Sequence, residues 1–86
     1  MNTDPSNPSV VKEFRFYPES NIVTVVFGDD NAEDFMGPEN YHLAAAAAAA
    51  AHTPSATASD LRLKDQNGNS ITVTVPKGAF RETFDA

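Results

Sequence analysis

The chain has 86 residues, with twelve acidic residues against six basic ones and a formal net charge of −6 at pH 7. A chain of this length forms one small domain with a modest core. Because it contains no cysteine, disulfide scaffolds, thiolate zinc sites and thiol nucleophiles are excluded. A protein without cysteine and with polar N-terminal residues is predicted to be cytoplasmic. No apolar run approaches the ~20 residues of a membrane span, so no membrane segment is expected.

The sequence divides into an N-terminal arm and one folded region. Residues 1–9 contain two prolines, two asparagines and two serines, a composition typical of a flexible or extended segment. The apolar side chains that can build a core all follow this segment. We therefore expect a flexible arm over residues 1–9 and a single small α+β domain over residues 10–86.

Two strands joined by a turn are predicted at the start of the domain. Residues 10–17 alternate between polar and apolar types, residues 22–27 are rich in β-branched types, and a Pro-Glu-Ser-Asn segment separates them. Pairing Tyr17 with Ile22 across this turn sets the register. The pairing places five apolar residues on one face, which we assign to the core: Phe14, Phe16, Val23, Val25 and Phe27. The opposite face is half apolar.

An acidic loop and a helix are predicted next. Residues 28–37 are rich in Gly, Asp and Asn, which is typical of a loop. Gly37 is an acceptable helix N-cap, and Pro38 is favoured at the first helical position. The helix is expected to end near His52, because the Thr-Pro pair that follows disfavours helical backbone. At that end a cationic histidine interacts favourably with the helix dipole.

A second hairpin is predicted over residues 60–75, where two apolar-polar alternations flank an Asn-Gly pair. A two-residue turn would place an apolar residue opposite a polar one on the same face. A three-residue loop ending at Gly68 instead pairs Leu63 with Ile71 and requires a left-handed backbone at that glycine. We prefer the three-residue loop.

Residues 79–84 are predicted to form one helical turn, because Phe80 and Phe84 have the i, i+4 spacing of neighbours on a helix. The predicted order is therefore β-β-α-β-β. It indicates an α+β fold with a four-stranded antiparallel sheet and one helix packed on one face. The order of the strands within the sheet does not follow from the sequence.

Eight consecutive alanines, residues 44–51, make up most of the predicted helix. Alanine has the highest helix propensity, but this run has no apolar stripe that fixes which side faces the sheet, so Tyr41 and Leu43 are expected to set the rotation. Three interpretations stay open. The helix lies close on the sheet, or it packs through small residues against a partner, or the run stands in for residues whose identity was not assigned.

The sequence offers little catalytic or metal-binding chemistry. His42 and His52 are ten residues apart on one helix, too far to share a metal ion or a proton relay. Neither Asp-rich loop has the calcium-loop pattern, and no serine has the glycine pattern of a nucleophile turn. We therefore expect no enzyme activity, no cofactor and no catalytic or metal-ligating residue. The net negative charge opposes direct binding to nucleic acid.

These observations predict a non-catalytic binding module, a regulator or inhibitor that docks on a larger protein with a basic surface. Small acidic proteins without cysteine are common among phage-type accessory proteins. This association rests on composition alone. The alternative is a structural subunit of a homo-oligomer or particle. The candidate contacts lie on the half-apolar sheet face and in the acidic loop: Arg15, Tyr17, Ile22, Val26, Asp29, Asp30, Glu33 and Asp34.

Overall fold

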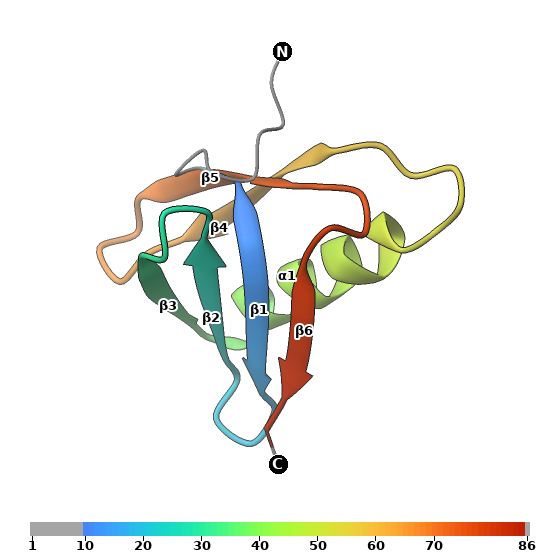
Figure 1. The fold of residues 1–86 in the computed structure, drawn as a ribbon. Coiled ribbons are helices and arrows are strands. Elements are labelled where there is room, and N and C mark those ends of the chain that lie inside the picture. The colour runs from blue at the N-terminus through green and yellow to red at the C-terminus, as the bar shows by residue number, and fades with distance from the viewer. Residues whose placement is uncertain (1–9, 86) are drawn as a thin grey trace.

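The computed structural model describes residues 10–85, so the arm predicted over residues 1–9 lies outside the described residues. The described residues form six strands and one helix, and the fold is α+β as the sequence predicts (Figure 1). The elements, in chain order, are β1 (Val11–Tyr17), β2 (Ile22–Phe27), β3 (Ala32–Met36), α1 (Pro38–Ala51), β4 (Ser59–Lys64), β5 (Ser70–Val75) and β6 (Arg81–Phe84).

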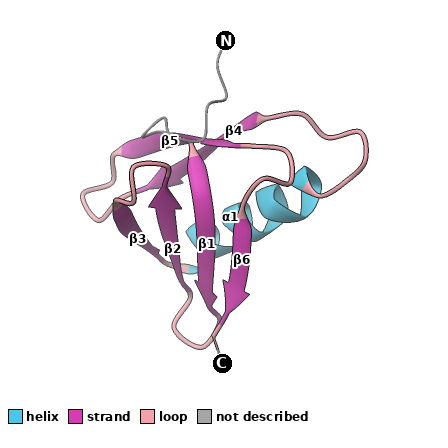
Figure 2. Ribbon diagram, viewed as in Figure 1, coloured by secondary structure: helices cyan, strands magenta, loops and turns pink. Residues whose placement is uncertain are grey.

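The strands form two sheets, whereas the sequence predicts one antiparallel sheet of four strands. The larger sheet has the order β3-β2-β1-β6, and the smaller one consists of β4 and β5. Strands β1, β2 and β3 pair antiparallel, but β6 runs parallel to β1, so the larger sheet is mixed. The prediction of an antiparallel sheet therefore holds for β1, β2 and β3 and is wrong for β6. Helix α1 and the β4–β5 hairpin lie on the same side of the larger sheet (Figure 2).

Strand β3 lies within the segment that the sequence predicts as a loop. Its five residues, Ala-Glu-Asp-Phe-Met, include four exposed side chains and one buried one, Phe35. A strand at the edge of a sheet pairs with one neighbour only and buries few side chains. Its sequence therefore does not have to alternate between apolar and polar residues. Pairing with β2 and the burial of Phe35 outweigh the weak strand propensity of this segment.

Strand β6 replaces the predicted helical turn over residues 79–84. A spacing of four residues is also two periods of a strand, so Phe80 and Phe84 share one face in either conformation. In the structure Phe80 meets Phe14 edge to face at 5.4 Å between ring centroids, and Phe84 stacks on Phe16 at 4.7 Å. Phe84 pairs with Phe16 in the register of β6 with β1, and Phe80 lies just before β6, so both rings reach the core face of β1.

Both predicted hairpin registers are confirmed. In the first, Tyr17 pairs with Ile22. In the second, Leu63 pairs with Ile71, and Gly68 has a φ of 84° at the end of a three-residue loop. The alternation of apolar residues sets each register, because a slip by one residue would turn every core side chain toward solvent.

One core joins the two sheets and the helix. Figure 1 shows the larger sheet in front of α1, with the smaller sheet crossing one end. A parallel bridge between Val10 and Thr74 links the two sheets at that end. The five residues predicted for the core face of the first hairpin are all buried there. The complete cluster is Val11, Phe14, Phe16, Val23, Val25, Phe27, Phe35, Ala44, Ala48, Ala51, Leu61, Leu63, Val73 and Val75.

Helix α1 buries a narrow line of small residues. Asn40, Ala44, Ala48 and Ala51 are buried, and their spacing places them on one side of the helix. This burial agrees with a helix that lies close on the sheet. Leu43 is 43% exposed, so the prediction that it helps to set the helix rotation is wrong, whereas Tyr41 packs against the core beside Phe16.

Asn40 is the only buried polar or charged residue among residues 10–85. Its Nδ2 donates hydrogen bonds to the Met36 carbonyl at 3.0 Å and to the Lys64 carbonyl at 2.8 Å. Its Oδ1 accepts a hydrogen bond from the Lys64 backbone N–H at 3.0 Å. One side chain therefore connects the first turn of α1 to the ends of β3 and β4 and fixes the rotation of a helix that has no apolar stripe.

Replacing Asn40 with Ala should destabilise the domain by roughly 1–3 kcal/mol, since it removes three part-buried hydrogen bonds to the backbone of Met36 and Lys64. Chemical denaturation measures the loss. Replacing the exposed neighbour Glu39 with Ala is the matched control and should cost less than about 1 kcal/mol. Equal losses for the two variants would contradict the role assigned to Asn40.

Placing Leu at Ala48 should destabilise the domain by roughly 1–3 kcal/mol, because the added atoms have no space between α1 and the sheet. Placing Leu at the exposed Ala46 should be nearly neutral. Thermal unfolding of the two variants checks this pair. If Ala48→Leu kept the melting temperature of the unmodified chain, close packing of the helix would be wrong.

Candidate binding surface

The face of the larger sheet that points away from α1 carries five of the eight predicted contact residues. Cross-strand partners in a sheet point to the same face, so the register identifies its members. We call this surface the outer face. It consists of Glu13, Arg15, Tyr17, Ile22, Thr24, Val26, Ala32, Asp34, Met36, Arg81 and Thr83.

A shallow hollow of about 390 Å³ lies on the outer face and is lined by Arg15, Tyr17, Ser20, Ile22, Thr24 and Asp34. It contains four of the residues predicted from the sequence, Arg15, Tyr17, Ile22 and Asp34. The sides of the hollow combine an aromatic ring and an aliphatic chain with one cation and one anion. Such a mixture is typical of a surface that binds a protein.

Polar side chains on the outer face bond to each other. Thr24 Oγ1 donates a hydrogen bond to Asp34 Oδ1 at 2.6 Å, between two strands. Arg15 Nε donates to Glu13 Oε2 at 2.9 Å, and this hydrogen bond, with the charge of the same carboxylate, raises the pKa of Arg15. These contacts orient the charged groups on both sides of the apolar centre.

Val26 lies on the outer face outside the hollow. It is half-buried and pairs with Glu13 on one side and Ala32 on the other. Together with Ile22 it extends the apolar part of the face along β2. The structure therefore brings the four predicted sheet residues onto one surface, with Arg15, Tyr17 and Ile22 at its centre.

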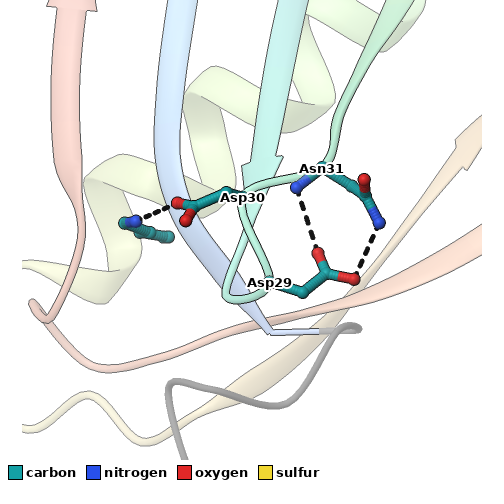
Figure 3. Close-up of polar contacts among 4 residues, drawn as sticks. Asp29, Asp30 and Asn31 are labelled. Carbon is teal, nitrogen blue, oxygen red and sulfur yellow. Dashed lines mark hydrogen bonds and ion pairs between the residues drawn. The ribbon is translucent and has the colours of Figure 1, made fainter.

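The four predicted acidic contacts do not form one loop. Asp29 and Asp30 lie in the turn between β2 and β3, and both have partners there (Figure 3). Asp29 accepts hydrogen bonds from the backbone N–H of Asn31 at 3.1 Å and from its Nδ2 at 2.7 Å. Asp30 has a φ of 71° and forms an ion pair with Lys12. These two acids shape the turn.

Glu33 and Asp34 lie in strand β3 and point to opposite faces of the sheet, because successive strand residues alternate. Asp34 belongs to the outer face. Glu33 is exposed on the side of the sheet that α1 covers. The prediction of a single acidic loop is therefore wrong, since a strand separates its charges.

Charge is distributed unevenly across the outer face. Its bases, Arg15 and Arg81, lie on β1 and β6, whereas no Lys or Arg occurs between residues 16 and 61. On the half of the outer face formed by β2 and β3, Asp34 is therefore the one charged residue, and the turn acids Asp29 and Asp30 lie beyond its end. A basic partner surface complements this half.

Three residues in or beside the hollow were not predicted as contacts: Ser20, Thr24 and Met36. Ser20 and Thr24 line the hollow, and Met36 is 51% exposed beside Ile22. Thr24 alternates with Ile22 and Val26 along β2, so the period of two already indicates its face. Met36 could be placed only after β3 is known to be a strand.

Other kinds of site have little support in the part of the chain that the structure describes. Residues 10–85 contain no group of three or more His, Cys, Asp or Glu side chains placed to hold a metal ion. They also form no helix with the length and apolar character needed to cross a membrane. Comparisons with protein-family models, curated proteins and solved structures found no match.

Replacing Asp29 with Ala should destabilise the domain by about 0.5–1.5 kcal/mol, because the turn loses two hydrogen bonds. Replacing Glu33 with Gln should change stability by less than about 0.5 kcal/mol, since its exposed carboxylate has no partner among the described residues. Urea denaturation of both variants checks the contrast. A larger loss for Glu33→Gln would show that the acids have been assigned to the wrong roles.

Proposed function

We propose that this protein is a small non-catalytic binding module that docks on a larger protein through the outer face. The observation that supports this most is the uncovered sheet face itself. Helix α1 and the β4–β5 hairpin cover the opposite face, whereas Tyr17, Ile22 and Val26 remain only half-buried. Aromatic and aliphatic side chains around a hollow supply the desolvated centre that protein interfaces require.

The chemistry of the surface favours a basic partner. Asp34 borders the hollow, and the turn acids lie at the end of β2, while the bases of the outer face lie on β1 and β6. Acidic groups around an apolar centre steer a basic protein toward it and raise its association rate. Such a module acts as a regulator or inhibitor, of the phage accessory type and in the cytoplasm.

The experiment uses the full chain as bait in three forms. These are the unmodified chain, Ile22→Asp, and Leu43→Asp as a matched control that places the same charge at an exposed position on α1. A photoreactive residue at Ser20, beside the hollow, crosslinks whatever protein docks there. The expected partner is captured by the unmodified chain and the control, and its yield with Ile22→Asp falls about tenfold or more.

Thermal unfolding of each bait shows that it is folded. A partner captured equally well by Ile22→Asp would contradict docking through the outer face. Crosslinks between copies of this chain alone would support a homo-oligomer subunit instead. Capture should also weaken as salt rises, because screening over ~8–10 Å reduces the attraction between the acidic half of the face and a basic surface.

A further inference from the structure

Strand β3 has a free edge. Phe27 N–H donates to the Asn31 carbonyl at 2.8 Å, and Gly37 N–H donates to the Asn21 carbonyl at 2.9 Å. In an antiparallel pair, hydrogen-bonded residues alternate with residues whose backbone groups point away. Glu33 and Phe35 therefore bond to β2, and the backbone groups of the even-numbered residues point away from it: Ala32, Asp34 and Met36.

These outward groups are largely unpaired. The Met36 carbonyl accepts a hydrogen bond from Asn40. The N–H and C=O groups of Ala32 and Asp34 have no hydrogen-bond partner within residues 10–85. The side chains of both residues are exposed. Strand β3 has no proline and no irregularity in its register, so its edge can accept another strand.

A hollow of about 410 Å³ lies between β3 and the loop that joins β4 to β5. It is lined by Ala32, Glu33, Asp34, Asp65, Gln66 and Asn67. Three of these six residues are acidic, and none is basic. An extended segment that pairs with β3 would lie beside these carboxylates, so lysine or arginine side chains fit it best.

Two other occupants fit the charges poorly. In its two most overlapping registers, an antiparallel pair of β3 strands from two copies would place Asp34 opposite Asp34 or Glu33 opposite Glu33. Like charges placed opposite each other destabilise a strand pair. Residues 1–9 of the chain contain an aspartate and no lysine or arginine. The acidic edge therefore points to a different protein.

We infer that the free edge of β3 accepts an extended basic segment of the partner protein as a fifth strand of the larger sheet. This inference rests on the proposed function, because it names how the same basic partner engages the sheet edge that borders the outer face. Backbone hydrogen bonds to Ala32 and Asp34 supply the pairing, and Glu33, Asp34 and Asp65 select the charge.

The test uses the full chain, labelled with ¹⁵N, and a synthetic nine-residue peptide of alternating Lys and Val with blocked ends. The readout is hydrogen exchange of individual amides by NMR. Exchange at Ala32, Asp34 and Met36 should slow about tenfold or more on binding. The amides of Glu33 and Phe35, already bonded to β2, should change little. A peptide of alternating Glu and Val is the charge control and should not bind.

A matched pair of variants isolates the backbone groups. Ala32→Pro removes one outward N–H without removing a bond to β2, a substitution that edge strands tolerate, whereas Ala32→Ser keeps the N–H. The Lys-Val peptide should bind Ala32→Pro about fivefold or more weakly than Ala32→Ser. Equal binding by the two variants, each shown to be folded by its spectrum, would overturn the inference.

The remaining outcomes separate this inference from the proposed function. If the peptide bound and shifted only resonances around Tyr17 and Ile22, with no protection at Ala32 and Asp34, strand addition would be wrong and docking on the outer face would stand. Absence of binding, or equal binding of the Glu-Val peptide, would also overturn strand addition. The bait experiment with Ile22→Asp tests the outer face independently of all these results.

Discussion

The fold depends on three hydrogen bonds made by one buried amide. A helix of alanines has high intrinsic helicity but can rotate or slide on a sheet, because each of its sides presents the same methyl groups. Asn40 removes this freedom, since its donors and acceptor match the Met36 carbonyl and the two backbone groups of Lys64. A buried amide left without these partners costs considerable free energy, so other rotations of α1 are disfavoured.

The small residues of α1 and the large residues of the sheet are complementary. Ala44, Ala48 and Ala51 bring the helix backbone close to the sheet, and aromatic side chains supply most of the bulk of the core. Phe14 and Phe16 contact the rings of Phe80, Phe84 and Tyr41. The β4–β5 hairpin closes the remaining side of this core. Within residues 10–85 all covering elements therefore lie on one side, and these residues leave the outer face and the edge of β3 uncovered.

The sequence predicts the parts of this fold that local pattern determines. Both hairpins follow from alternation and turn chemistry, and Gly68 has the left-handed conformation that its loop requires. Strand β3 could not be predicted, because its stability comes from pairing with β2 rather than from its own residues. Phe80 and Phe84 share one face in a helix and in a strand, and only the pairing of β6 with β1 distinguishes the two. The pairing of a C-terminal strand parallel to β1 has no local signal.

The part of the candidate surface that lies on the first hairpin could also be predicted from local pattern. Arg15, Tyr17 and Ile22 meet in the hollow because the register of the first hairpin follows from the sequence. Asp34 lies beside them in the hollow, and Glu33 points to the other face of the sheet, because β3 is a strand and not a loop. Asn40 had no sequence signal, since an asparagine in the first turn of a helix ordinarily faces water.

The most direct test of whether Asn40 fixes one rotation of α1 is an NMR measurement on a sample with ¹³C-labelled alanine methyl groups. It records nuclear Overhauser contacts between these methyl groups and the aromatic rings of the core. Contacts to core side chains are expected from Ala44, Ala48 and Ala51, and none from the exposed Ala46, Ala49 and Ala50. In Asn40→Ala the contacts should spread among the alanines as the helix loses its fixed rotation. Similar contacts from all the alanines of the unmodified chain would contradict the account.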